Sequence, residues 1–253
     1  MVVSTELDSV ASWIRDARQI VVLTGAGIST ESGIPDFRGP QGVWTKNPGA
    51  EKTANLQYYM SDPDIRKRSW QNRLSSEMWR AEPNSGHRAL ADLERKAALH
   101  TLVTQNIDRL HHKAGTSPER VIEIHGNAHE VKCMSCTFRG PMDETLERVR
   151  AGEDDPRCLG CGGILKSATI SFGENLVPAD LERAQLAAQG SDVFLAIGTS
   201  LTVYPAAALP EVALNAGAQL VVMNAQDTPF DGVAAAVFNE ELGTVLPELV
   251  TRV

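Results

Sequence analysis

The four cysteines of this chain lie in two Cys-x-x-Cys pairs, Cys133 with Cys136 and Cys158 with Cys161, separated by 21 residues. Each pair can place two thiolates on one tetrahedral metal ion, and a set of four leaves no open position for a substrate. We therefore predict one structural zinc ion. The alternatives are disulfides, an iron–sulfur cluster or a redox-active dithiol, although a dithiol centre needs only one pair beside a helix start.

A second chemical pattern is a glycine-rich run near the beginning of the chain. Gly25, Ala26 and Gly27 follow the short apolar run 20–23. Glycines at the end of a buried strand let backbone N–H groups approach a pyrophosphate, and a helix N-terminus adds favourable partial charge. The common dinucleotide fingerprint has a third glycine where Thr30 stands here, so the pattern disfavours an ordinary dehydrogenase.

Polar residues also follow the other apolar runs of the chain. These runs are 102–103, 121–124, 193–197 and 220–223, and the residues that follow them are Gln105, Asn106, Asp108, His125, Gly198, Thr199, Ser200 and Asn224. Ligands of parallel sheets collect at the carboxyl ends of the strands, so we expect these residues to lie close together. The imidazole of His125, which titrates near neutral pH, suits a general base.

The elements that must position these residues alternate along the chain. The apolar runs predict strands, and apolar residues at helical spacing predict helices over 7–17, 85–98, 178–188 and 205–216. This alternation indicates an α/β fold with a Rossmann-like, doubly wound parallel sheet. Two segments interrupt it: 47–83, where Asp62 before Pro63 is a helix-start signal, and 133–161, which holds the cysteine pairs.

We therefore predict two domains. Segments 1–45, 84–131 and 166–253 would form the larger, Rossmann-like domain. Segments 46–83 and 132–165 would form a smaller inserted domain, in which a helical insertion packs beside the zinc knuckles.

The composition excludes several classes of protein. With 42% hydrophobic and 22% charged residues, the 253-residue chain has the make-up of a globular protein and not of a disordered or fibrous one. Its formal charge of −8 disfavours a general nucleic-acid binder. The start of the chain lacks the basic and apolar regions of a signal peptide, and prolines and polar residues interrupt the uncharged stretch 193–210. We expect a monomeric, cytoplasmic protein that neither spans a membrane nor binds nucleic acid directly.

The glycine-rich run is part of a longer pattern that resembles the signature of the sirtuins, NAD-dependent protein-lysine deacylases. Residues 25–39 read GAGISTESGIPDFRG. Further motifs in the family's order are TQNIDRLH at 104–111, EIHGN at 123–127, the two cysteine pairs, FGE at 172–174, GTSL at 198–201 and VMN at 222–224. The resemblance extends over almost the whole chain and looks bacterial in type.

The resemblance implies an enzyme that removes acyl groups, with acetyl as the first choice, from lysine side chains of proteins or peptides. The products would be free lysine, nicotinamide and O-acyl-ADP-ribose. In the family His125 would assist a ribose hydroxyl as the general base, and Asn106 and Asp108 would bind the nicotinamide and its ribose. The implied NAD-binding residues are Gly25, Ala26, Gly27, Asp36, Phe37, Arg38, Gln105, Asn106, Ile107, Asp108, Gly198, Thr199, Ser200 and Asn224.

The resemblance also implies a substrate segment, in which Ile170, Phe172, Gly173 and Glu174 pair backbone to backbone with an extended peptide. Sirtuins that remove succinyl or malonyl groups hold the acyl carboxylate with a Tyr-x-x-Arg pair. This chain offers Trp70 and Arg73 at the corresponding positions. A desuccinylase or demalonylase is therefore an alternative, as are a mono-ADP-ribosyltransferase that uses the same cofactor, a non-catalytic NAD sensor and, for the knuckles, a nucleic-acid module.

Overall fold

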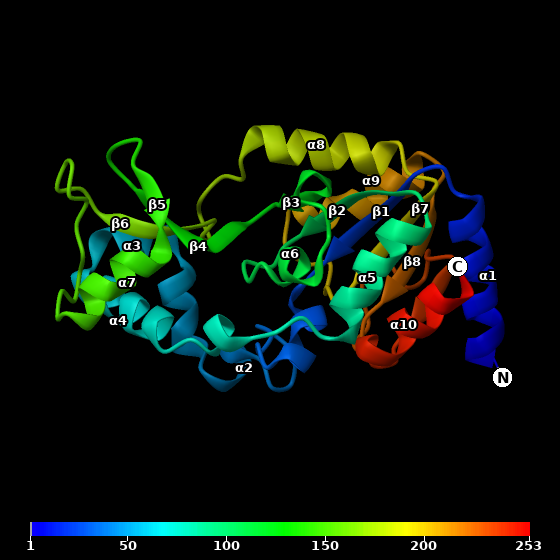
Figure 1. Ribbon diagram of the computed structural model, residues 1–253, viewed down its shortest axis with the longest axis horizontal. Coiled ribbons are helices and arrows are strands. Elements are labelled where there is room, and N and C mark those ends of the chain that lie inside the picture. Colours follow the sequence, from blue (N-terminus) through cyan, green and yellow to red (C-terminus); the bar gives the residue numbers. More distant parts are fainter. Residues whose placement is uncertain (1) are drawn as a thin grey trace.

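A parallel sheet of six strands, in the order β3-β2-β1-β7-β8-β9, forms the body of the larger domain (Figure 1). The computed structural model describes residues 2–253. The strands are β1 (Ile20–Thr24), β2 (Leu99–Thr104), β3 (Val121–Glu123), β7 (Val193–Ile197), β8 (Gln219–Met223) and β9 (Ala236–Phe238). The strand order reverses direction between β1 and β7, which makes this edge the topological switch point of a doubly wound sheet. The predicted fold class is confirmed.

Helices cover both faces of this sheet, because its central strands are apolar on both sides. Ile20 and Val22 of β1 belong to one core, and Val21 and Leu23 belong to the other. The first core packs against α1 (Val2–Asp16), α5 (Ser85–Lys96) and α10 (Leu242–Arg252), and the second against α8 (Pro178–Gln189) and α9 (Leu209–Asn215). Shorter helical turns are η1 (Ala26–Ser32), α6 (Leu110–Ala114), η4 (Pro118–Arg120) and η5 (Ala206–Ala208).

The smaller domain, at the left of Figure 1, contains an antiparallel sheet in the order β5-β4-β6. Its strands are β4 (Gly126–Cys133), β5 (Arg139–Pro141) and β6 (Leu165–Thr169). Its helices are α3 (Leu56–Ser61), α4 (Pro63–Leu74) and α7 (Met142–Arg150), with short turns α2 (Val43–Lys46), η2 (Pro48–Ala54) and η3 (Glu77–Arg80). The side chain of Asp62 caps α4 through the Asp64 amide at 2.8 Å, as its position before Pro63 predicted.

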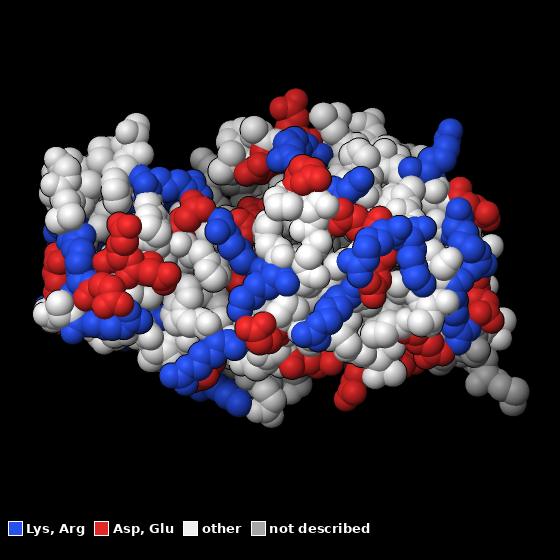
Figure 2. Space-filling model, in the orientation of Figure 1, with Lys and Arg blue, Asp and Glu red and all other residues white. Residues whose placement is uncertain are grey.

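The strand β4 joins the two domains. It begins directly after His125, at the end of β3, and runs into the three-stranded sheet, where Gly126 pairs with Thr169 of β6. The domain boundary predicted between residues 131 and 132 thus falls within a continuous strand. In the face that Figure 2 shows, acidic and basic side chains are interspersed. No helix of the described residues has the length and apolarity to cross a membrane.

A buried ion pair fixes the helical insertion to the loop that carries the second cysteine pair. The Nε atom of Arg66, on α4, lies 3.0 Å from each carboxylate oxygen of Asp155. Its Nη1 atom donates to the carbonyls of Tyr59 and Met60 at 3.1 and 3.2 Å. Arg157 is a second partner of Asp155, at 2.9 Å.

Replacing Arg66 by alanine is expected to lower the free energy of unfolding by about 3 kcal/mol, because Asp155 would lose its buried partner and retain only Arg157. Urea denaturation monitored by tryptophan fluorescence measures this loss. The matched control is Arg68→Ala on the exposed face of the same helix, which is expected to change stability by less than about 0.5 kcal/mol. Equal stability of the two variants would show that the Arg66 pair does not hold the insertion in place.

Candidate active site

Two glycine-containing loops meet at the switch point of the large sheet. The amide of Gly25 donates to the Ile197 carbonyl at 3.0 Å, and that of Gly27 donates to the Gly198 carbonyl at 2.8 Å. A Cβ atom at Gly25 would lie 2.6 Å from the Gly198 oxygen, and one at Gly27 would lie 2.8 Å from the Gly198 Cα. The glycines are therefore required for the close contact between the loops that follow β1 and β7, whatever else they bind.

Asn106 and Asp108 follow β2 at the same edge, and only 8% and 5% of their surfaces are exposed. The Asn106 amide nitrogen donates to the Gly25 carbonyl at 3.0 Å and to Ser29 Oγ at 3.1 Å. Ser29 in turn donates to Asp108 Oδ2 at 2.7 Å. Both N–H groups of the Asn106 side chain are thus used inside the protein, which leaves its carbonyl oxygen as the atom that can accept a bond from a ligand.

Two buried histidines support this network. His87 is fully buried, its Nδ1 lies 3.0 Å from Asn84 Oδ1, and its Nε2 approaches Ser29 Oγ at 3.5 Å. His111 is also buried, and its Nε2 lies 2.9 Å from Thr24 Oγ1. Burial lowers the pKa of His87 to about 4 and that of His111 well below its ordinary value, so both rings are neutral near pH 7. Ser29 thus connects His87 to Asp108, a link that the sequence analysis did not predict.

His125 lies half-buried between β3 and β4, beside the end of β2. Its Nδ1 atom is 3.2 Å from the carbonyl oxygen of Gln105. Because a carbonyl only accepts, this bond places the proton of the neutral ring on Nδ1 and leaves the lone pair on Nε2. Burial lowers the pKa of His125, although the bond to Gln105 opposes this shift. The ring is therefore neutral near pH 7, in the form that can take a proton.

The remaining polar residues predicted for the cofactor surround this edge. Gln105 donates from its side chain to Thr199 Oγ1 at 2.8 Å, which connects the ends of β2 and β7. Ser200 Oγ lies 2.8 Å from Thr202 Oγ1. Asn224 follows β8, next to Gly198, whose amide donates to the Met223 carbonyl at 2.8 Å. Ile107, between Asn106 and Asp108, accepts a backbone hydrogen bond from Ala128 at 2.9 Å.

The segment after η1 folds onto an aromatic cluster. Asp36 Oδ1 accepts from the Gly39 amide at 3.1 Å, and the ring of Phe37 lies 4.7 Å from that of Trp44. The guanidinium of Arg38 also lies over Trp44, at 4.7 Å from its centroid. Trp44 further contacts Phe172, with 5.4 Å between the centroids. Trp44, which sequence reasoning did not assign, thus connects the predicted cofactor segment with the predicted substrate segment.

Hydrogen bonds within the chain already use part of the predicted substrate segment. The Phe172 amide donates to Ala54 and its carbonyl accepts from Leu56, both at 2.9 Å, and Ile170 donates to the His125 carbonyl at 2.8 Å. Glu174 accepts from the Ser171 amide at 3.1 Å and forms ion pairs with Lys132 and Lys166. Among the described residues the amide of Gly173 has no such partner, so it is the backbone donor available to a peptide.

Trp70 and Arg73 occupy different environments, although both lie on α4. Only 1% of the Trp70 surface is exposed, because its ring packs in the core of the smaller domain against Val131 and Leu146. Arg73 is half-buried near Tyr59, and burial lowers its pKa. Burial is also the main reason why the pKa of Lys166 is lowered, and the charge of Arg73 adds to this effect. Within the described residues its guanidinium has no carboxylate partner.

The four cysteines converge at the tips of two loops of the smaller domain. Their Sγ atoms all lie within 4.8 Å of one another, with 3.5 Å between Cys133 and Cys161 and 3.8 Å between Cys136 and Cys158. Tetrahedral zinc with bonds of about 2.3 Å requires sulfurs about 3.8 Å apart, so the set fits zinc. The four thiols are free of disulfide bonds. This cluster is the structural zinc-binding site.

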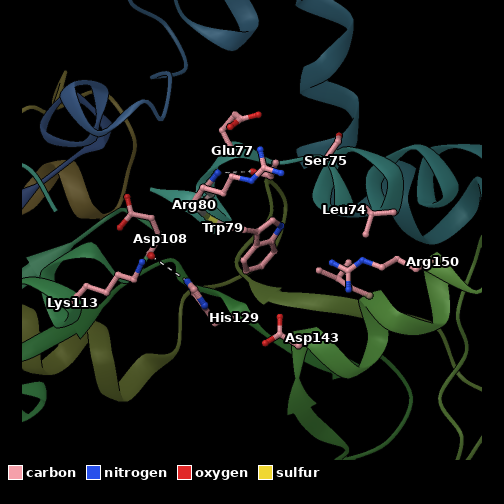
Figure 3. Close-up of a pocket in the computed structure, with 13 residues that line it drawn as sticks. Leu74, Ser75, Glu77, Trp79, Arg80, Asp108, Lys113, His129, Asp143 and Arg150 are labelled. Atoms are coloured by element: carbon pink, nitrogen blue, oxygen red, sulfur yellow. Dashed lines mark hydrogen bonds between the residues drawn. The ribbon is translucent and has the colours of Figure 1, made fainter. Parts of the chain in front are cut away.

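A cavity of about 410 Å³ lies behind Asp108, between η3, α6, β4 and α7 (Figure 3). Trp79 and His129 meet edge to face at its centre, with 5.3 Å between their rings, and Arg150 and Asp143 border it from α7. The Nε2 atom of His129 lies 3.1 Å from the Asp108 carbonyl oxygen. The cavity therefore borders the back of the candidate site. Among the described residues that line it, only Asp108 was predicted from the sequence as a catalytic or cofactor-binding residue.

The known proteins to which this chain is similar are consistent with the fold and the candidate site described above. The model of the Sir2 family matches residues 25–205. The chain is 52% identical to NAD-dependent protein deacetylase 2 of Streptomyces coelicolor, over 91% of this chain and 96% of that protein. It is 41% identical to the NAD-dependent protein deacetylase of Sulfolobus acidocaldarius, over 98% and 95% of the two chains.

Solved structures show the same similarity. A Sir2 enzyme with deacetylated p53 peptide and 3'-O-acetyl ADP ribose superposes with a TM-score of 0.88 at 34% identity, covering 97% of this chain and 96% of that one. Sir2Tm bound to a propionylated peptide gives a TM-score of 0.87 at 31% identity, covering 97% and 98%. The fold, the polar residues at the switch point, the four-cysteine zinc site and these similarities together show that the chain belongs to the Sir2 family of NAD-dependent protein deacetylases.

Proposed function

We propose that this deacetylase transfers the acetyl group of protein acetyl-lysine to the ADP-ribose part of NAD and consumes one water molecule, giving free lysine, nicotinamide and O-acetyl-ADP-ribose. The observation that carries the assignment of roles is the bond between His125 Nδ1 and the Gln105 carbonyl, which leaves the lone pair of Nε2 free to act as a base. Bound NAD would supply the electrophilic ribose carbon from which nicotinamide leaves. The chain's own residues hold the reactants and move one proton.

Each polar group at the switch point has a role that its hydrogen bonds allow. The free Asn106 oxygen accepts from the nicotinamide carboxamide, and the Asp108 carboxylate, held by Ser29, orients this end of the cofactor. His125 Nε2 takes a proton from a ribose hydroxyl, which makes that oxygen a better nucleophile. The remaining predicted contacts divide between the pyrophosphate and the riboses, and the residues that make them are Gly25, Ala26, Gly27, Arg38, Gln105, Ile107, Gly198, Thr199, Ser200 and Asn224.

The peptide is proposed to bind along the Ile170 to Glu174 segment. The Gly173 amide is free to donate, whereas Phe172 is held by Ala54 and Leu56 and presents its ring to Trp44. Phe37 and Asp36, on the facing segment, would cover the reacting ribose and exclude water. Backbone pairing of this kind reads little side-chain identity, so we expect a broad choice of peptide sequence.

The direct test uses acetyl-lysine and succinyl-lysine versions of one peptide, each with and without NAD. Peptide mass and released nicotinamide are followed together. Loss of the acetyl group only with NAD, in step with nicotinamide, would support the proposal. Nicotinamide release with ADP-ribose added to protein, and no loss of acetyl, would favour a mono-ADP-ribosyltransferase instead. That the protein is cytoplasmic and monomeric stays a prediction. Analytical sedimentation tests the oligomeric state.

Removal of acidic acyl groups is a second candidate, and the observation that favours it is the unpaired guanidinium of Arg73 beside the Tyr59 phenol. A buried carboxylate would find a charge-assisted partner there. The fully packed Trp70 offers no second donor at the surface, although its buried Nε1 atom has no partner.

If Arg73 binds an acyl carboxylate, the Arg73→Met variant is expected to lose about 10- to 100-fold in kcat/KM on the succinyl peptide, the worth of one hydrogen bond to a charged group. Its kcat/KM on the acetyl peptide is expected to change little, because acetyl carries no charge. Arg68→Met on the exposed face of α4 is the control. Equal losses on both peptides would show that Arg73 acts only on the fold of the pocket.

A further inference from the structure

Arg109 has an unusual backbone conformation directly beside Asp108, a residue of the candidate site. It follows Asp108 directly, and its φ of 60° and ψ of 18° put it in the left-handed region. Glycine adopts this conformation without steric cost, whereas an arginine is strained there. Such strain persists only where the surroundings hold the residue firmly, and it concentrates at functional sites.

The side chain of Arg109 supplies that hold through two acidic residues. Its Nη2 atom lies 2.7 Å from Glu130 Oε1, and its Nε lies 3.5 Å from Glu123 Oε1. The second oxygen of Glu123 accepts from Asn127 at 2.9 Å, and the second oxygen of Glu130 pairs with Arg139. Each carboxylate therefore gives one oxygen to Arg109 and the other to another residue, and His112 Nδ1 also lies 3.9 Å from the Glu123 oxygen that faces Arg109. The cluster is half-buried, and burial raises the pKa of Glu123 while the charge of Arg109 opposes the shift.

The two acids belong to segments that carry other parts of the site. Glu123 ends β3, two residues before His125, and Glu130 lies in β4, the strand that runs into the smaller domain. The backbone beside Arg109 is attached to the same strand, since Ala128 donates to the Ile107 carbonyl at 2.9 Å and His129 Nε2 lies 3.1 Å from the Asp108 carbonyl. One guanidinium thus joins the Asp108 loop, the His125 segment and the strand between the domains.

We propose that Arg109 is a positioning residue for deacetylation, which sets Asp108 and His125 at their working separation through its ion pairs with Glu123 and Glu130. Arg109 contacts neither reactant in this proposal, which rests on the roles assigned above to Asp108 and His125. Its loss is therefore expected to slow the chemical step and to leave the binding of either substrate nearly unchanged.

The test is the variant Arg109→Gly, which keeps the left-handed backbone without strain and removes only the guanidinium arm. We expect kcat to fall about 10- to 100-fold, as for other losses of supporting contacts at a site. Binding of ADP-ribose, measured by calorimetry, is expected to stay within about twofold of the wild type, since no ligand contact is lost. Arg139→Gly removes the other partner of Glu130 without touching the loop, and its turnover is expected to match the wild type.

Two further measurements separate positioning from a general loss of fold. Millimolar guanidinium chloride is expected to restore part of the turnover of Arg109→Gly, whereas sodium chloride at equal ionic strength is not. The double variant Arg109→Gly/Glu130→Gln is expected to be no slower than Arg109→Gly alone, because both changes remove one pairing.

If the Arg109→Gly variant turned over as fast as the wild type, the proposal would be overturned. It would also be overturned if the variant lost activity together with a lowered Tm and guanidinium did not restore the activity. Additive losses in the double variant would also overturn it. The wild-type enzyme is assayed separately, since its NAD-dependent turnover tests the proposed function and not the part that Arg109 plays.

Discussion

Replacing His125 by asparagine is expected to lower kcat for deacetylation by about a thousandfold, within the range for loss of a general base. Asparagine is similar in size and retains an N–H donor for the Gln105 carbonyl, which accepts from the imidazole at 3.2 Å in the wild type. What it lacks is a lone-pair nitrogen at the position of Nε2. The local fold is therefore expected to survive while the proton acceptor is lost.

Cofactor binding separates this role from damage to the site. The network around Asn106, Ser29 and Asp108 contains no bond to His125, so affinity for ADP-ribose is expected to change less than about threefold. The control is His100→Asn, at an exposed position of β2, for which turnover is expected to be unchanged. Unchanged turnover in His125→Asn would remove this residue from the base role.

The pH profile gives an independent check of the same assignment. A general base works in its neutral form, so activity is lost as pH falls through its pKa. Burial places the pKa of His125 below the ordinary imidazole value of about 6.5. The acidic limb of kcat/KM is accordingly expected below pH 6.5, and a limb above neutral pH would contradict a buried, neutral imidazole. In His125→Asn this limb is expected to disappear from the residual activity.

The large sheet could be predicted because its central strands are simple in physical terms. β1, β7 and most of β8 are buried on both faces, so they appear in the sequence as unbroken apolar runs that end at glycine or polar residues. The residues after such runs meet at one edge in any doubly wound sheet. This is why the sequence predicted that Asn106, His125 and Gly198 would lie together.

The smaller sheet does not follow from its sequence in the same way. β6 is buried throughout, yet it contains Lys166, Ser167 and Thr169. Buried polar residues argue against a strand unless their partners are known, and the partners of Lys166 include Glu174 and the Thr169 carbonyl. In the large sheet, β9 was also not predicted, because a strand of only three residues is too short for a periodic pattern.

The supporting residues of the site were missed for a related reason. Ser29, His111 and Trp44 act through partners that the fold alone brings close, such as Thr24 for His111. Nothing in a single sequence distinguishes a buried histidine that accepts or donates one hydrogen bond from a surface histidine. The family resemblance could indicate the residues that meet the ligands, but not those that hold these residues in place.

Replacing Cys158 by serine is expected to release about one equivalent of zinc and to unfold the smaller domain. Zinc held by structural sites of this kind contributes about 10–16 kcal/mol of apparent binding energy, which is of the same size as the whole stability of a domain, about 5–15 kcal/mol. The matched control is Ser135→Ala, which lies between two of the ligands, is exposed and keeps all four thiolates. Zinc content by mass spectrometry and thermal unfolding by calorimetry measure the two effects.

The unequal cores explain why the loss should be confined to one domain. The larger domain has two apolar cores, of 25 and 17 buried residues in the described chain, whereas the core of the smaller domain has eight, of which Cys133 and Cys158 are themselves zinc ligands. A core of that size does not support a fold alone. Without zinc, β6 would lose its register with β4, and the Ile170 to Glu174 segment that follows it would lose its support. Peptide binding is therefore expected to be abolished in Cys158→Ser, while ADP-ribose still binds the larger domain. If the Cys158→Ser protein kept its zinc and its affinity for the peptide, the cysteine cluster would not be what holds the smaller domain together.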